Sequence, residues 1–169
     1  MESERLIDDL DLTALAAAVG QALAARNQFL VTAESCTGGG VGAAVTAVPG
    51  SSGWYERGFI TYTNTAKREM LGVSEATLQR HGAVSEATAR EMAEGALRHS
   101  RAQVGVAVTG VAGPSGGTPA KPVGMVCFAW AGSGDTVAVT RRFTGDRQAV
   151  RRQSVACALQ GLLDLLAAP

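Results

Sequence analysis

The stretch 32–40 combines side chains and backbone groups that could attack an amide or hold an anion. It reads Thr-Ala-Glu-Ser-Cys-Thr-Gly-Gly-Gly, and it places Ser35 and Cys36 between an apolar run and a segment of small residues. This order predicts a strand, a tight turn and a helix. A hydroxyl or thiol beside the unpaired N–H groups of a helix start could form a nucleophile next to an oxyanion hole. The same parts could also form a plain anion cradle, or only a helix start capped by Thr37.

A lysine offers the base that such a serine needs. Lys67 follows the strand-like run 58–62, so Tyr62 and Lys67 are expected at the same edge of the sheet as Ser35. A lysine withdrawn from water loses its proton more readily and can then accept the proton of a serine hydroxyl. The spacing therefore fits a serine–lysine pair better than a histidine triad, while a surface lysine on a short helix stays the alternative interpretation.

The sequence offers few suitable residues for other kinds of catalytic site or for a metal site. The only histidines, His81 and His99, lie at predicted helix ends, which does not favour a Ser-His-Asp triad. The chain has three cysteines, widely spaced, so neither a disulfide framework nor a Cys-x-x-Cys zinc motif is expected. We expect no metal and no cofactor. A thiol amidase built on Cys36 stays an alternative, although no histidine partner is evident for it.

Length and charge narrow the class of protein. The 169 residues suit a single domain over 1–169. Fifteen basic and fifteen acidic side chains cancel, which argues against nucleic-acid binding. Apolar runs are shorter than a membrane span requires, and the start of the chain lacks a signal-peptide core. Together with the unpaired cysteines, these features predict a cytoplasmic location.

Hydrophobic periodicity predicts alternating strands and helices, with one late hairpin. The first helix carries an apolar stripe from Leu12 to Leu23, with Asp11 as its expected cap. We expect strands at 29–32, 58–62, 104–108, 123–130 and 136–143, and further helices near 41–48, 64–71, 74–79, 85–97 and 146–166. This order predicts an α/β fold, a three-layer α/β/α sandwich with a mixed, mainly parallel sheet. Active groups should gather beyond the carboxyl ends of its strands, where the glycine- and proline-rich loop 109–122 also begins.

Several blocks of the sequence resemble the C-terminal domain of the competence-damage protein CinA. They follow in order at Ala33–Gly39, Pro49–Ser52, Gly58–Lys67, Gly82–Glu86, Thr109–Pro114, Lys121–Gly124 and Gly145–Arg147. The resemblance thus covers almost the whole chain from about Leu12 onward. Met125 departs from the pattern, because a small polar residue is expected there.

The resemblance implies an enzyme of pyridine-nucleotide recycling. Stand-alone members of the family are nicotinamide-nucleotide amidohydrolases, which convert nicotinamide mononucleotide (NMN) to nicotinate mononucleotide and ammonia without a metal. Carried over, Ser35 is the nucleophile, Lys67 the general base, and Tyr62 a hydrogen-bonding or proton-relay partner.

The resemblance also suggests the substrate-binding groups and the assembly. Backbone N–H groups at the start of the Gly38-Gly39-Gly40 helix could hold the oxyanion, and Thr37, Gly38 and Gly39 would bind the substrate. Ser52 and Thr109 would be further polar groups of the site, and Arg147 would bind the 5′-phosphate. A homodimer is expected by resemblance alone. A binding or competence-related interaction domain without turnover remains the alternative function.

Overall fold

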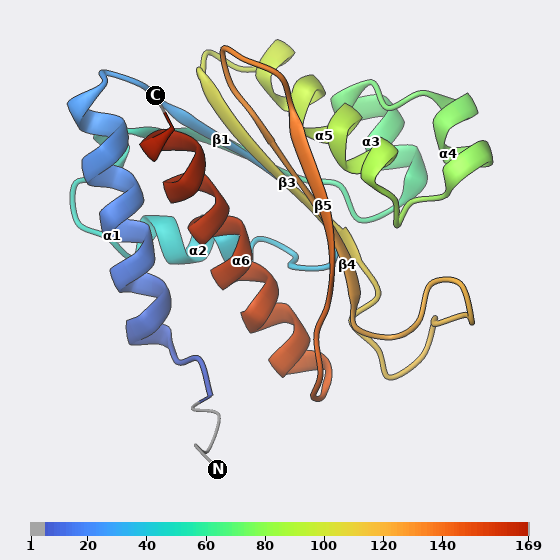
Figure 1. The fold of residues 1–169 in the computed structure, drawn as a ribbon. Helices are drawn as coiled ribbons and strands as arrows, with labels where there is room; N and C mark the ends of the chain where they lie inside the picture. The colour runs from blue at the N-terminus through green and yellow to red at the C-terminus, as the bar shows by residue number, and fades with distance from the viewer. Residues whose placement is uncertain (1–5, 169) are drawn as a thin grey trace.

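A five-stranded sheet lies between two layers of helices (Figure 1). The computed structural model describes residues 6–168. The strands are β1 (Leu30–Glu34), β2 (Tyr55–Ile60), β3 (Val104–Gly110), β4 (Met125–Ala131) and β5 (Val137–Arg142), in the spatial order β2-β1-β3-β4-β5. Pairings β2–β1 and β1–β3 are parallel, whereas β3–β4 and β4–β5 are antiparallel, so only β4 opposes the common strand direction. The predicted α/β class and mixed sheet are confirmed.

The helices cover both faces of this sheet. On one face lie α1 (Asp9–Ala25), α2 (Gly40–Thr46) and α6 (Arg147–Ala167); on the other lie α3 (Asn64–Leu71), α4 (Glu75–His81) and α5 (Glu86–Arg98) (Figure 1). A short 3-10 helix, η1 (Ser51–Gly53), precedes β2. Two apolar cores result, one around Phe128 and Leu159 beneath α6, and one around Met92 and Val31 beneath α5.

The ends of several elements differ from the expected ones. Asp8, not Asp11, caps α1; Asp11 instead completes the capping box by accepting the N–H of Asp8 at 2.9 Å. Thr37 does not cap α2, because Gly39 occupies the cap position with a left-handed φ of 104°. Strand β2 ends at Ile60, so Tyr62 lies beyond it. Thr63, Ser74 and Ser85 cap α3, α4 and α5, and the predicted late hairpin is confirmed as β4–β5.

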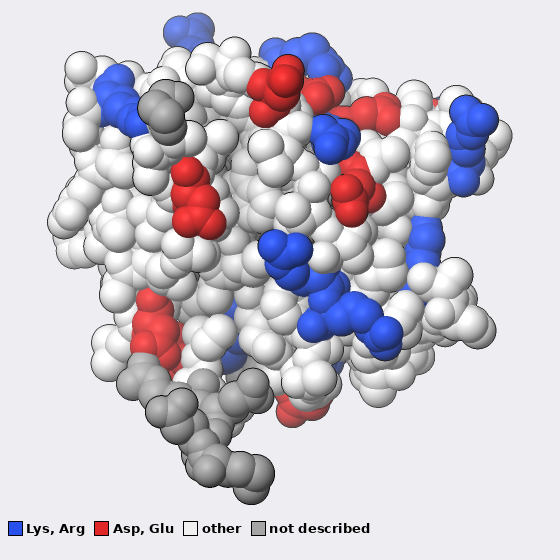
Figure 2. Space-filling model, in the orientation of Figure 1, with Lys and Arg blue, Asp and Glu red and all other residues white. Residues whose placement is uncertain are grey.

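The surface carries mixed charge. Figure 2 shows acidic and basic side chains interspersed on one face, with a run of basic side chains across β5. The formal net charge of the whole chain is zero. Among residues 6–168, no helix is long and apolar enough to cross a membrane.

A glycine in α5 sets the position of α3, the helix that carries Lys67. A Cβ atom on Gly95 would lie 1.9 Å from the carbonyl oxygen of Leu71, the last residue of α3. A backbone oxygen cannot rotate away as a side chain would. Only glycine therefore allows α3 to pack this closely on α5.

We predict that Gly95→Ala destabilises the protein and lowers its activity. Alanine normally favours a helix by about 1 kcal/mol over glycine, but overpacking costs roughly 1–3 kcal/mol, and here α3 must move. Denaturant unfolding should show a lower midpoint. Gly53→Ala is the matched control, because a Cβ there meets nothing within 4 Å. An unchanged or raised midpoint for Gly95→Ala would contradict this account.

Candidate active site

The turn after β1 holds Ser35 at the carboxyl end of the sheet. The Ser35 N–H donates to the Val108 carbonyl at 2.9 Å, which extends the pairing with β3 by one residue. The N–H of Gly38 then donates to the Ser35 carbonyl at 3.0 Å and closes the turn. Gly38 and Gly39 have φ of 58° and 104°, a left-handed backbone that favours glycine. The Ser35 side chain is held at the base of a pocket, with 7% of the residue exposed.

Lys67 reaches Ser35 from the opposite helix layer. It lies in the first turn of α3, and its Nζ is 3.0 Å from Ser35 Oγ. The same nitrogen donates to the backbone carbonyls of Thr61 at 2.9 Å and Tyr62 at 3.3 Å. The amine thus has three oxygen partners, two backbone carbonyls and the Ser35 hydroxyl. The structure therefore brings together the two residues that the sequence paired.

Burial changes the acidity of both reactive side chains next to Ser35. Lys67 is only 1% exposed, and loss of hydration lowers its pKa to about 8, well below the ordinary lysine value. The same loss of hydration raises the pKa of Cys36 to about 12. Near neutral pH the lysine is thus ready to give up its proton, while the cysteine remains a thiol. A nearby helix start could lower the pKa of the Cys36 thiol, but the effect of burial is larger and raises it.

A small pocket of about 160 Å³ opens over this pair. Arg147 lines it from the start of α6, donating to the Tyr62 phenol oxygen at 3.3 Å and to the Gly113 carbonyl at 2.8 Å. Thr109 lies in the wall with its hydroxyl donating to the Ala83 carbonyl at 2.9 Å. The remaining lining residues are Ser35, Cys36, Lys67, Val84, Gly110 and Ala112.

Tyr62 takes part through its backbone more than through its phenol. Its carbonyl accepts from Lys67, whereas the residue is 62% exposed and its hydroxyl accepts from Arg147. Tyr62 therefore contacts the pair through its carbonyl, and its phenol lies at the pocket beside Arg147.

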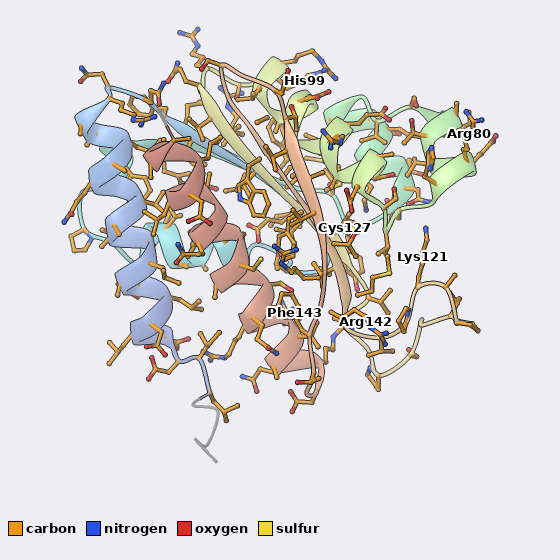
Figure 3. All side chains as sticks on the ribbon, viewed as in Figure 1. Arg80, His99, Lys121, Cys127, Arg142 and Phe143 are labelled. Carbon is orange, nitrogen blue, oxygen red and sulfur yellow. The ribbon has the colours of Figure 1, made fainter. Side chains whose placement is uncertain are left out.

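A second, larger hollow adjoins the pocket. It has a volume of about 660 Å³ and shares Ala112 and Arg147 with the pocket above the serine–lysine pair. Arg151 and Gln148 also line it. The loop that forms one wall is fastened to α4 by Lys121, whose ammonium donates to the His81 carbonyl. Figure 3 shows this lysine reaching from the loop toward α4.

The expected oxyanion donors are largely engaged within the protein. The N–H groups of Val41 and Gly42 donate to the Glu34 carboxylate at 2.8 and 3.1 Å, and that of Gly40 donates to the Thr37 carbonyl at 2.9 Å. The Thr37 hydroxyl also donates to Glu34, at 2.6 Å. The start of α2 is thus not an open anion cradle.

Ser52 does not reach the site, which corrects the expectation for this residue. It lies in η1, directly before β2. Leu30 at the start of β1 pairs with Tyr55 at the start of β2. Hence η1 lies at the opposite end of β1 from Ser35. The Pro-Gly turn before Ser52 indicated a loop but contained no signal for which end of the sheet it would occupy.

Two charged residues that contact the turn were not singled out from the sequence. Glu34 is a buried carboxylate, and Arg151 donates to the carbonyls of Cys36 and Thr37 at 3.1 and 3.2 Å. Arg151 could have been found, because it stands one helical turn after Arg147 and so on the same face of α6. Residues 6–168 hold no group of three or more His, Cys, Asp or Glu side chains placed to share a metal ion.

Comparisons with known proteins agree over nearly the whole chain. The model of the CinA C-terminal domain family matches residues 12–166. A nicotinamide-nucleotide amidohydrolase PncC of Escherichia coli K12 is 55% identical over 159 residues, covering 91% of this chain and 94% of the relative. A protein of the same name from Pseudomonas putida is 51% identical over 154 residues, covering 91% and 96%.

A solved structure shows the same fold. The competence/damage inducible protein CihA from Agrobacterium tumefaciens superposes with a TM-score of 0.90 at 43% identity, covering 96% of this chain and 99% of that one. A family match spanning most of the sequence, relatives above 50% identity and this superposition lead to one conclusion. The chain belongs to the CinA C-terminal domain family.

Proposed function

We propose that this chain hydrolyses the carboxamide of NMN to nicotinate mononucleotide and ammonia. The names of the E. coli and P. putida relatives support the substrate, because those proteins are nicotinamide-nucleotide amidohydrolases. The observation that carries the proposal is the buried pair of Lys67 Nζ and Ser35 Oγ, 3.0 Å apart in a pocket. An amide is a poor electrophile, so its hydrolysis needs an activated nucleophile of this kind.

The pair supplies both proton transfers of the first half-reaction. Neutral Lys67 takes the Ser35 proton as Oγ attacks the carboxamide carbon. The resulting ammonium then protonates the amide nitrogen, the C–N bond breaks, and ammonia leaves the acyl-enzyme. In the second half, Lys67 takes a proton from water while the hydroxide attacks the ester. The same proton returns to Ser35 as the acid is released. Donors for the oxyanion would come from the N–H groups of Thr37 and Gly39, because that of Gly38 is taken by the Ser35 carbonyl.

The second hollow suits the ribosyl phosphate of the same substrate. Arg147 stands where this hollow meets the pocket over Ser35, so a carboxamide at Ser35 would place the rest of a nucleotide beside a guanidinium. Guanidinium groups bind phosphate oxygens with strong, charge-assisted hydrogen bonds. Thr109, whose hydroxyl is held by Ala83, would shape the wall against the nicotinamide ring.

Two other functions are less well supported. A thiol amidase would need the Cys36 thiolate, but burial raises the pKa of this thiol to about 12. A binding domain without turnover would gain nothing from burying a lysine against a serine, since withdrawing an amine from water costs stability. Release of ammonia from NMN separates the enzyme from the binding domain. We also propose a cytoplasmic homodimer, to be tested by sedimentation of the purified chain.

We predict that Ser35→Ala lowers kcat at least about 10³-fold and leaves NMN binding nearly intact, because the lost bond is made only during reaction. Cys36→Ala should keep most of the activity. Single-turnover ammonia release would measure the first effect and calorimetry the second. Near wild-type turnover by Ser35→Ala, or a folded Cys36→Ala enzyme that binds NMN without turning it over, would end the Ser35 assignment.

The activity should rise with pH through the pKa of Lys67. The base must be neutral, and its pKa is about 8, so kcat/KM should increase about tenfold per pH unit below that value and level off above it. Measurements above pH 7 avoid the phosphate pKa near 6. Lys67→Ala should cost roughly 10²–10⁴ in kcat, and Lys67→Arg should not restore the rate, because arginine keeps its proton. A flat profile, or an active Lys67→Arg enzyme, would make Lys67 a binding residue instead.

Arg147→Ala should weaken the use of NMN mainly through KM. Loss of a charge-assisted bond worth about 1.5–3 kcal/mol corresponds to roughly a 10- to 100-fold rise. Nicotinamide riboside, which lacks the phosphate, should be hydrolysed equally by both enzymes. Arg80→Ala is the control for losing one positive charge, since this side chain points outward from α4 (Figure 3). Equal losses on NMN and riboside would place Arg147 elsewhere in the mechanism.

A further inference from the structure

Glu34 is a buried carboxylate directly before the nucleophile. The residue is 2% exposed and ends β1, and its carbonyl accepts from the Thr61 N–H at 2.8 Å. Its side chain accepts three hydrogen bonds: from the Thr37 hydroxyl at 2.6 Å, the Val41 N–H at 2.8 Å and the Gly42 N–H at 3.1 Å. Burying a carboxylate is unfavourable unless hydrogen bonds replace its lost hydration, and these three bonds do so.

These bonds join the strand before Ser35 to the helix after it. The cap position of α2 is Gly39, which has no side chain with which to cap the helix. The carboxylate of Glu34 takes over that role from five residues upstream. As a result, Glu34 precedes the segment 35–39 in the chain and its side chain also binds the helix that follows the segment. The left-handed backbone of Gly38 and Gly39 is therefore held between β1 and α2.

A second side chain holds the same turn from outside. Arg151 donates from Nε to the Cys36 carbonyl at 3.1 Å and from Nη2 to the Thr37 carbonyl at 3.2 Å. Glu34 therefore satisfies N–H groups that follow the turn, and Arg151 satisfies carbonyls within it. The two residues fix its backbone through groups of opposite polarity.

We propose that Glu34 is a positioning residue for Ser35. It holds the turn so that Ser35 Oγ stays 3.0 Å from Lys67 Nζ. The inference rests on the proposed hydrolysis, in which a displacement of about 1 Å in the nucleophile can cost about 10²-fold in rate. Glu34 acts on Ser35 indirectly, since all three hydrogen-bond partners of its carboxylate belong to the turn or to α2.

A carboxylate is required because all three partners are donors. In Glu34→Gln, the carbonyl oxygen of the side chain can still accept from Thr37 and Val41. Its NH₂ group would then face the Gly42 N–H, which brings two donors together and leaves both unpaired. The substitution preserves volume and removes the charge; of the three hydrogen bonds it breaks only this one.

The test compares Glu34→Gln with Glu91→Gln in the full-length chain. Glu91 is a matched control, because its carboxylate also accepts the N–H of a helix-capping residue, Ser74, at 2.9 Å, and neither residue lines the pocket over Ser35. We expect Glu34→Gln to lower kcat roughly 10- to 100-fold with KM for NMN within about threefold. The pH midpoint of kcat/KM should not move, because Lys67 is unaltered. Wild-type kcat, a loss confined to KM, or a shifted midpoint would overturn the positioning role.

Thr37 provides a milder second variant in case Glu34→Gln does not fold. Thr37→Val removes one donor to the carboxylate at nearly constant volume, whereas Thr37→Ser keeps the hydroxyl. We expect Thr37→Val to lower kcat and Thr37→Ser to retain more of it, again with an unchanged pH midpoint. Equal kcat for the two Thr37 variants would contradict the proposal.

Two readouts do not depend on NMN. Amide hydrogen exchange at Val41 and Gly42 should be faster in Glu34→Gln, and a fluorophosphonate should label Ser35 more slowly than in the wild type. If the wild type releases no ammonia from NMN, the proposed function fails, and these readouts still decide the role of Glu34. Unchanged exchange and labelling would refute that role even in an active enzyme.

Discussion

Burial of the Lys67 amine against Ser35 is the interaction on which the site depends. Withdrawing an ammonium from water is costly, so the protein favours the neutral form that a general base requires. The carbonyls of Thr61 and Tyr62 accept hydrogen bonds from the amine, and Ser35 Oγ is its third partner at 3.0 Å. These contacts hold the Lys67 nitrogen beside the hydroxyl from which it would take a proton.

The same desolvation acts with opposite sign on the adjacent cysteine. Charge appears on lysine when it gains a proton and on cysteine when it loses one, so burial lowers the pKa of Lys67 and raises that of Cys36. Burial therefore makes Lys67 easier to deprotonate, as a base requires, and keeps Cys36 as an unreactive thiol. Residue type alone could not choose between Ser35 and Cys36. Burial distinguishes them, because it raises the pKa of the Cys36 thiol and lowers that of Lys67, the base for Ser35.

Much of the fold, and the pairing of Ser35 with Lys67, could be predicted from periodicity and order. Both residues follow strands whose carboxyl ends meet at one edge of the sheet, and topology alone brings such ends together. What failed depended on details finer than the topology. Ser52 lies at the wrong end of β1, because the η1 turn returns the chain to the start of the sheet.

The hydrogen bonds by which Glu34 holds the turn could not be predicted from the sequence pattern either. A glutamate that ends a strand gives no sign that its side chain will cap the helix after the next turn, since that depends on how closely the two elements approach. Thr37 was one possible cap of α2 by residue type, but its hydroxyl donates to the Glu34 carboxylate instead. Helix α6 supplies the remaining link. Arg147 lines the substrate pocket and Arg151, one turn later on the same face, holds the carbonyls of the nucleophile turn. A phosphate bound at Arg147 would fix the helix that also braces Ser35. Binding energy from the unreactive end of the substrate would then be used to hold the catalytic geometry at the reactive end.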